Sequence, residues 1–261
     1  MMLCLHQASA MVRSSKTPDA HLRQWGGLSP NQFYKPSYPI WRWVVSIHKP
    51  IKLIIIRHGE TYLNARGIHQ GQLGGSLNAK GKRQAQRLAL VLRKEKIHAI
   101  YSSDLRRAVQ TTRIIARYHV VPIIYTSDLR ERHMGVFQGR PWSETAEMRA
   151  SGKDFTPEGG ESDADQARRT RHFIARIRCN KTLEGKTVLI SAHAGTVWMI
   201  TSLFTKTPLH NIKRLKARNT GMLVFEISRR KNRLVSDEMF EGIFDGSKRD
   251  KTGTQRKPKK A

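Results

Sequence analysis

The sequence predicts an α/β fold: a three-layer sandwich in which helices cover both faces of a mainly parallel central sheet. Two observations carry this prediction. First, strand-like and helix-like patterns alternate along the middle of the 261-residue chain, as expected of strands joined by helical crossovers. Second, the run 52–56 is almost entirely Leu and Ile, which is typical of a strand buried on both faces of a parallel sheet.

The first half of the pattern contains three strands and two helices. After the strand at 52–56, residues 80–95 repeat apolar side chains with the period of an amphipathic helix. A short strand is expected at 98–101. Residues 105–118 form the next predicted helix, because Ala108, Val109, Thr112 and Ile115 fall on one side of it. A strand at 120–125 follows.

The second half begins with a helix whose start is marked by a capping box. Ser162 and Asp165 have the spacing of that motif, and the helix is expected to run to about Cys179. A buried strand at 187–191 precedes a helix at 195–204. The last predicted strand covers 222–227, as an edge strand or in a hairpin with 233–235.

Three regions are expected: a basic N-terminal extension at 1–49, disordered or targeting; a domain at 50–236; and a basic C-terminal tail at 237–261. Lys and Arg number 48 against 20 Asp and Glu, a net charge of +28. Such a field attracts phosphorylated molecules, nucleic acid or an anionic surface. No apolar run reaches the length of a membrane span.

The composition also indicates a compartment. Cys4 and Cys179 lie far apart, a spacing that supports neither a disulfide framework nor a thiolate metal site. We therefore expect a cytoplasmic protein. The alternative is mitochondrial or other organellar targeting, if the acid-poor extension acts as a transit segment.

Histidines and arginines follow the predicted strands where ligands bind in open parallel sheets. Arg57, His58 and Gly59 end the first strand, His193 ends the strand at 187–191, and Arg107 lies in the first turn of a helix. Arginine forks match phosphate oxygens, and a helix N-terminus adds positive potential. An unprotonated imidazole can serve as nucleophile if an acid protonates the leaving oxygen. These residues predict phosphoryl transfer.

Seven co-linear segments then resemble the histidine phosphatase superfamily, whose fold is called phosphoglycerate mutase-like. They are RHGETYLN (57–64), HQGQ (69–72), SSDLRRAVQT (102–111), LRERHMG (129–135), PEGGES (157–162), ISAHAG (190–195) and NTGM (219–222). The resemblance covers about 52–228. It implies a phosphoric monoester hydrolase with a phosphohistidine intermediate, no metal and no cofactor.

The resemblance also implies roles for individual residues. His58 would accept the phosphoryl group, Glu131 would be the general acid, and His193 would complete the catalytic set. Phosphate contacts would come from Arg57, Arg107, Asn64 and Gln70. Glu131 could instead pair with Arg130 or Arg132, and Gln70 could be a simple loop amide. The histidines at 48, 69, 133, 172 and 210 are expected to be surface or incidental.

Hydrolysis is favoured over mutase-type transfer to substrate, since Glu131 and His193 lie only 62 positions apart, without the long insertion of the mutases. The expected partner is a phosphorylated small molecule. Two departures from the family pattern are Ala194, where glycine is commoner, and Met199, where arginine is frequent. An alternative is a basic nucleic-acid-associated protein with a secondary or lost phosphatase site. Binding of nucleic acid or an anionic surface through the tails, and a homodimer, stay open.

Overall fold

The computed structural model describes residues 49–151, 154–213, 215–229 and 231–239. Apart from Lys49 and residues 237–239, the predicted N-terminal extension and C-terminal tail lie outside this range. Among the described residues, no helix has the length and apolar character needed to cross a membrane.

The strands that the structure describes form one six-stranded sheet in the order β3-β2-β4-β1-β5-β6. They are β1 (Ile51–Arg57), β2 (Ala99–Ser103), β3 (Ile123–Thr126), β4 (Thr187–Ala192), β5 (Met222–Ile227) and β6 (Asn232–Asp237). The first four in this spatial order run parallel, whereas β5 and β6 pair antiparallel. The predicted mainly parallel sheet is therefore confirmed.

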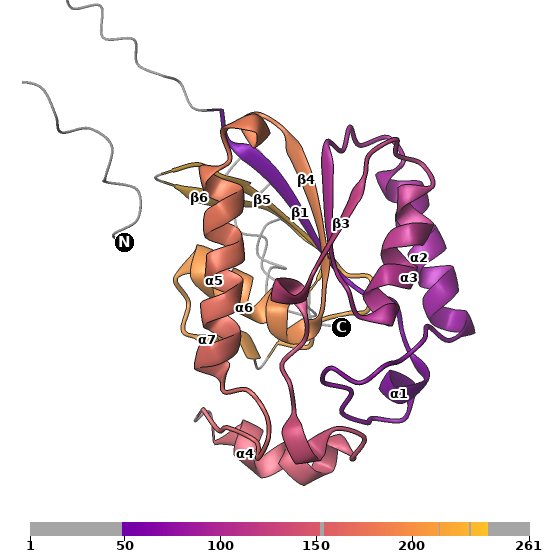
Figure 1. Ribbon diagram of the computed structural model, residues 1–261, viewed down its shortest axis with the longest axis vertical. Helices are drawn as coiled ribbons and strands as arrows, with labels where there is room; N and C mark the ends of the chain where they lie inside the picture. Colours follow the sequence, from indigo (N-terminus) through magenta and orange to yellow (C-terminus); the bar gives the residue numbers. More distant parts are fainter. Residues whose placement is uncertain (1–48, 152–153, 214, 230, 240–261) are drawn as a thin grey trace, which may run out of the picture. The chain divides into compact units, whose positions relative to one another are not determined.

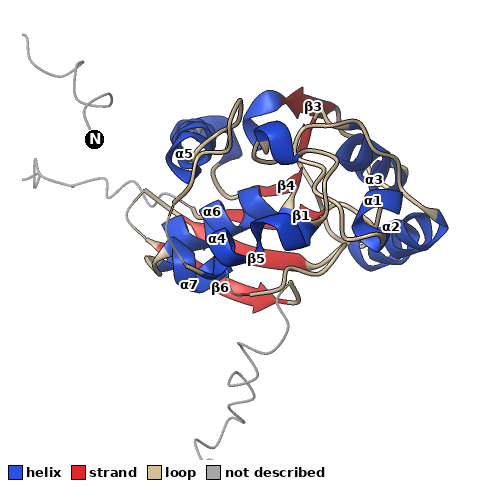
Figure 2. Ribbon diagram, turned by 90° about the horizontal axis from the view of Figure 1, so that it is seen from below, coloured by secondary structure: helices blue, strands red, loops and turns tan. Residues whose placement is uncertain are grey.

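Helices cover both faces of the sheet, as predicted (Figures 1 and 2). On one face, α2 (Ala79–Leu92) and α3 (Arg106–Ala116) pack Leu88 and Ile115 against Ile54 and Ile100 of the sheet. On the other face lie α5 (Asp163–Cys179), α6 (Ala194–Thr205) and α7 (Leu209–Lys213). The buried residues of each helix form the apolar side of its amphipathic pattern, and this side packs against the sheet.

Short elements and boundaries differ from the predictions. The helices α1 (Tyr62–Ala65), α4 (Ala146–Ala150) and α7 have four or five residues, too few to show a period. The predicted tail also begins too early, since β6 ends at Asp237 and Met239 is fully buried in the core. The N–H of Arg218 donates to the Met239 carbonyl, which fixes this segment to the loop before β5.

The sheet brings the two predicted histidines together. In the parallel pair β1–β4, Arg57 is the register partner of Ala192, so the next residue of each strand is a histidine. The His58 N–H donates to the Ala192 carbonyl at 3.1 Å. The β2 strand lies on the other side of β4 and ends at Ser103. The carboxyl ends of three neighbouring strands thus meet at one place.

Candidate active site

His58 is a buried imidazole whose hydrogen bonds define its protonation. Its Nδ1 lies 2.7 Å from the Gly59 carbonyl oxygen, which can only accept, so Nδ1 carries the proton. Nε2 therefore has a lone pair, and it faces the Nε of Arg107 at 3.3 Å. Burial, and then the charges of Arg107 and Arg57, hold the pKa of His58 well below its usual value. The neutral imidazole is a nucleophile at neutral pH.

Arg107 connects the two histidines. It is the second residue of α3 and is 1% exposed. Its Nε lies 3.3 Å from Nε2 of His58 and 3.2 Å from Nδ1 of His193. The two terminal nitrogens donate to the carbonyls of Leu73 and Gly71 at 3.0 and 2.7 Å. Burial lowers the pKa of Arg107 to about 10, with Glu131 opposing and Arg57 adding to that shift, so the group stays charged at neutral pH.

His193 is the N-cap residue of α6 and is completely buried. Because Arg107 donates to its Nδ1, the neutral ring carries its proton on Nε2, which donates to the Ser103 hydroxyl at 2.8 Å. Burial and the Arg107 charge hold the pKa of His193 well below its usual value. The His58 and His193 rings are 5.1 Å apart. Ser103 belongs to the SSDLRR segment, but the sequence did not single it out.

The loop before β5 fixes the backbone around Arg57 and His58. The amide nitrogen of Asn219 donates to the His58 carbonyl at 3.0 Å, and the N–H of Thr220 donates to the Arg57 carbonyl at 3.1 Å. One terminal nitrogen of Arg57 donates to the Ala217 carbonyl, and burial lowers the pKa of Arg57. Its Nε has no hydrogen-bond partner among the described residues. The Nε–H group of Arg57 can therefore donate a hydrogen bond to a ligand.

The Glu131 carboxylate rests on the first turn of α6. One oxygen accepts from the Gly195 N–H at 3.1 Å, and the other accepts from the Arg132 N–H at 2.9 Å and from the Gln166 amide at 3.3 Å. No sequence signal marked Gln166, which lies on the buried face of α5.

The side chains of the neighbouring arginines have other partners. Arg130 pairs with Asp104 at 2.5 Å, and Arg132 pairs with Asp163 at 2.9 Å. The alternative in which Glu131 is consumed by an ion pair with one of these arginines is therefore wrong. Both partners come from distant parts of the chain, so only the fold leaves Glu131 available.

Arg169 holds the segment that carries Glu131. Its guanidinium donates to the carbonyls of Asp128, Arg130 and Glu131 at 2.9, 2.7 and 3.1 Å. It also binds both carboxylate oxygens of Glu161 at 3.0 Å. Burial of Glu161 raises its pKa, but the Arg169 hydrogen bonds, the His133 backbone N–H and the neighbouring charges together outweigh this, and the net pKa is lowered. Arg169 is thus a structural cation inside the site rather than a surface charge.

The remaining predicted phosphate ligands differ in how the structure uses them. Gln70 is 7% exposed, and its amide oxygen has no hydrogen-bond partner among the described residues. This oxygen can accept a hydrogen bond from a ligand, whereas a contact with phosphoryl oxygens needs the amide nitrogen of Gln70 as donor. Asn64 instead accepts from the Thr61 N–H at 3.3 Å in the capping box of α1, so its phosphate contact stays a prediction.

The expectation of a surface or incidental role was wrong for His69. This side chain is 8% exposed, and its Nε2 lies 2.7 Å from the Thr145 hydroxyl. It joins the loop that carries Gln70 to the short helices after Glu131. The sequence spacing of 76 positions gave no signal of this contact.

Gly195 allows the approach of Glu131 to α6. A Cβ at this position would lie 2.1 Å from the Glu131 carboxylate and 2.9 Å from the Gln166 amide nitrogen. We expect Gly195→Ala to displace Glu131 and to lower kcat about 100-fold, as for loss of a positioned general acid. Hydrolysis of an ester with a very acidic leaving group should fall much less, because that group needs no proton.

Ala194→Gly is the matched control for this variant. It introduces glycine one residue earlier, at the first position of α6, where the expected cost is a stability loss of up to about 1 kcal/mol. Its kcat should stay within threefold of wild type. Equal activity losses in the two variants would contradict the role assigned to Gly195.

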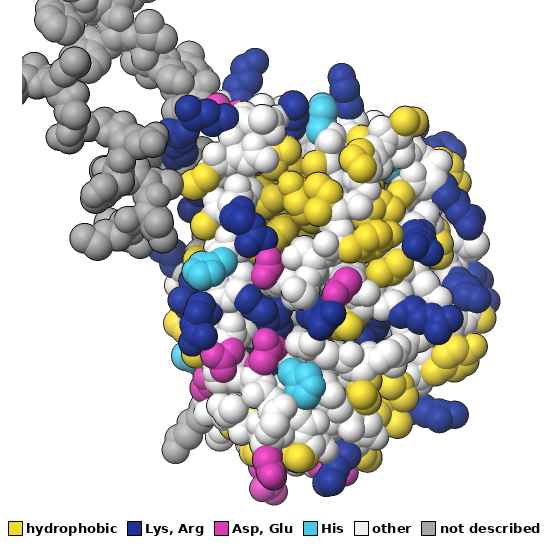
Figure 3. Space-filling view, in the orientation of Figure 1, with side chains coloured by type: hydrophobic (Ala, Val, Ile, Leu, Met, Phe, Trp, Pro, Cys, Tyr) yellow, Lys and Arg dark blue, Asp and Glu magenta, His cyan; other side chains and the backbone are white. Residues whose placement is uncertain are grey.

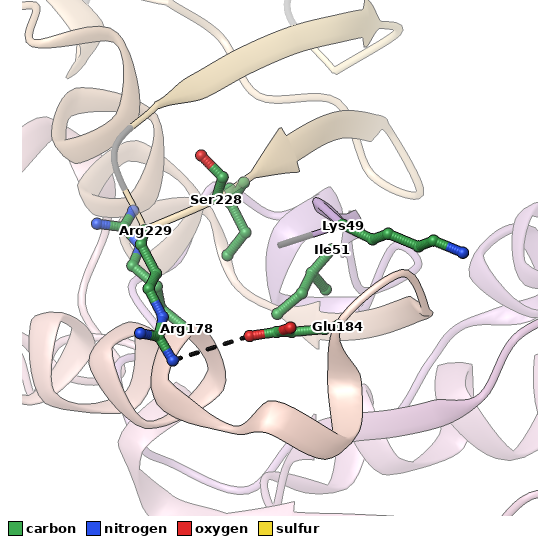
Figure 4. Close-up of a pocket in the computed structure, with 7 residues that line it drawn as sticks. Lys49, Ile51, Arg178, Glu184, Ser228 and Arg229 are labelled. Carbon is green, nitrogen blue, oxygen red and sulfur yellow. Dashed lines mark ion pairs between the residues drawn. The ribbon is translucent and has the colours of Figure 1, made fainter. Parts of the chain in front are cut away.

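A small cavity lies at the other end of the strands from this site (Figure 4). It lies between Lys49, Arg178, Glu184 and Arg229, with a cavity volume of about 10 Å³. That volume holds about one water molecule. Arg229 reaches Glu184 at 3.9 Å, so the cations there face an acid.

Comparison with known proteins agrees with this geometry. The model of the histidine phosphatase superfamily (branch 1) matches residues 53–238. Phosphoglycerate mutase-like protein 4 of Arabidopsis thaliana is 36% identical over 187 residues, which cover 67% of this chain and 79% of that protein. Metal-independent phosphoserine phosphatase of the same plant is 37% identical over 157 residues, 56% of this chain and 65% of that protein.

Solved structures give the same result. A mycobacterial glucosyl-3-phosphoglycerate phosphatase complexed with VO3 superposes with a TM-score of 0.65 and 29% identity, and the match covers 72% of this chain and 99% of that one. The family model matches most of the folded region, and the histidines and arginines of the motif meet at one centre. The chain belongs to the histidine phosphatase superfamily, branch 1.

Proposed function

We propose that the protein hydrolyses phosphomonoesters of small anionic metabolites through a phosphohistidine on His58. The observation that carries this proposal is the state of the His58 imidazole. It is buried and neutral, its Nδ1 proton is held by the Gly59 carbonyl, and its Nε2 faces a charged arginine. This is the arrangement that an in-line phosphoryl acceptor needs.

In the first step, Nε2 of His58 attacks phosphorus and the ester P–O bond breaks. Glu131 gives a proton to the leaving oxygen, so the alcohol departs neutral. Arg57 and Arg107 neutralise the equatorial phosphoryl oxygens, and the amide N–H of Gln70 donates to them. For this step the Nε of Arg107 releases the His58 Nε2 lone pair, and its terminal nitrogens exchange the carbonyls of Gly71 and Leu73 for phosphate oxygens.

In the second step, water attacks the phosphoryl group and the N–P bond breaks. The Glu131 carboxylate takes the proton from water, which returns the acid to its starting state. Inorganic phosphate leaves, and His58 regains its lone pair. His193 donates to Ser103 and accepts from Arg107, so it holds the Arg107 guanidinium in position beside the phosphoryl oxygens.

The substrate class rests on charge and on the substrates for which similar proteins are named. These include a phosphoserine phosphatase and a glucosyl-3-phosphoglycerate phosphatase, whose substrates each carry a carboxylate beside the phosphate. Together with the net charge of +28, this favours a phosphomonoester with a second anionic group. A mutase-type transfer to a second substrate molecule is the alternative.

The test is hydrolysis of a generic aryl phosphate by the purified protein with chelator present. We expect turnover without added metal, and a phosphate panel should then show preference for esters with a second anionic group. Phosphate release into water, measured against transfer to added phosphoglycerate, separates hydrolysis from mutase activity. A protein inert on the aryl ester and on the whole panel would refute the proposal.

We further propose a cytoplasmic location, with organellar targeting by residues 1–49 as the alternative, on the composition of the chain alone. Imaging of a C-terminally tagged full chain and of a variant lacking residues 1–49 tests this. A homodimer remains open, and sedimentation of the purified chain decides it. Binding through the basic tails involves residues outside the described part of the chain.

A further inference from the structure

Most of the basic clusters on α5 are neutralised in the folded domain. Arg168 pairs with Asp165 at 3.1 Å, Arg169 binds Glu161, and Arg176 pairs with Asp128. The α5 sequence supplies two of its own acids in the first turn. Three of the five arginines of this helix are therefore paired with acids.

The helices α2 and α3 are different. Neither contains an Asp or a Glu. Their exposed cations, with those of the segments that follow them, form a surface that we call the α2–α3 face: Lys80, Lys82, Arg83, Arg87, Arg93, Lys94, Lys96, Arg106, Arg113 and Arg117. Among the described residues, Lys80 is the one cation of this set with an ion pair, to Glu60 at 2.7 Å.

These cations share one side of the molecule. The two helices lie side by side on the same face of the sheet, so their outer surfaces point to solvent together (Figures 1 and 2). Figure 3 shows Lys and Arg side chains gathered along the side that α2 and α3 form, at the right of the view. Arg83 and Arg87, and likewise Arg113 and Arg117, are four residues apart, a spacing at which like charges repel.

We propose that the α2–α3 face binds the phosphate backbone of duplex nucleic acid. A polyanion is the partner that an unneutralised basic surface fits by charge. The 14 residues of α2 span about 21 Å, which corresponds to about six base pairs of duplex. In the chain from 79 to 118, which carries this face, Tyr118 is the one exposed aromatic side chain. Contact is therefore through phosphates rather than through stacked bases, and independent of base sequence.

The test is fluorescence anisotropy of a labelled DNA duplex with the full chain, at several salt concentrations. We expect binding whose logarithmic dependence on salt has a slope of about −0.9 for each phosphate neutralised. The variant Arg83→Gln/Arg87→Gln/Arg117→Gln should reduce the magnitude of this slope by about 2.7 and weaken binding about tenfold or more. None of the three residues belongs to the catalytic centre, so aryl phosphate hydrolysis should stay unchanged.

The matched control is Arg171→Gln/Lys181→Gln/Lys186→Gln, which removes the same charge from exposed positions elsewhere on the domain. It should keep the slope within one unit of wild type. If both variants lose the same amount of binding, net charge alone explains the loss. If the α2–α3 variant binds as wild type does, other segments of the chain carry the binding. Either result overturns the proposal, as does the absence of duplex binding. Stronger retention by vesicles of anionic lipid than by duplex would identify a membrane surface instead.

Discussion

Replacing His58 by alanine is expected to lower kcat/KM for an aryl phosphate by at least about 10⁴-fold, the scale of removing a nucleophile. Among the described residues the nearest other imidazole is His193, at 5.1 Å between ring centroids; its ring is tilted by 58° from that of His58, and its Nε2 is held by the Ser103 hydroxyl. The measurement is steady-state hydrolysis with chelator, beside thermal unfolding to show that the variant folds.

Trapping the intermediate distinguishes a nucleophile from a merely structural histidine. Wild type quenched during turnover should carry a base-stable, acid-labile phosphoryl group, and His58→Ala should carry none. Added imidazole should restore part of the activity to His58→Gly, which leaves space where the ring was. A variant that retains activity within tenfold of wild type, or that still acquires the label, would contradict the assignment.

Replacing Arg107 is expected to have the second largest effect, about 10³-fold on kcat/KM for Arg107→Gln. An arginine that stabilises a transferring phosphoryl group contributes about 10³–10⁵-fold to kcat. Its charge also lowers the pKa of His58, so its removal should raise that pKa toward the usual value. The acid limb of the pH–rate profile should then move to higher pH, because His58 is protonated, and inactive, over a wider range.

Arg107→Lys separates charge from geometry. A lysine keeps the positive charge, so the acid limb should stay nearer to that of wild type, yet it lacks the planar fork that reaches His58, His193 and the 71–73 loop together. We expect an activity loss of about 10²-fold. Because Arg107 is buried, thermal unfolding of both variants is needed. Superimposable pH profiles for wild type and Arg107→Gln would exclude the electrostatic coupling.

The same lowered pKa values predict that the folded protein loses stability at low pH. The folded-state pKa of both histidines is lowered, so between that value and about 6.5 the unfolded chain binds protons that the folded chain does not. Stability from these two groups is complete above about pH 6.5 and declines as the pH falls below it. The neutral state that favours nucleophilic attack therefore lowers the stability of the folded protein at acidic pH.

The sequence by itself determined the order of the principal strands and helices, and which strand ends carry chemistry. The apolar run 52–56 and the capping box at Ser162 each involve residues close together in the sequence. Such local patterns predict an element directly, and the structure contains both elements. His58, His193 and Arg107 were predictable because each follows a strand in a parallel sheet. The short helices α1, α4 and α7 were not, since four or five residues carry no period.

Only the tertiary structure decided which charged and polar groups have protein partners and which face solvent or the site. Arg130 and Arg132 find acids 26 and 31 positions away, which leaves Glu131 to the N-terminus of α6. Arg169 donates to three carbonyls and a carboxylate, whereas Arg83 and Arg87 face solvent among other cations. A hydrogen bond or ion pair is a short-range contact between groups that folding brings together, and the linear sequence does not contain those distances.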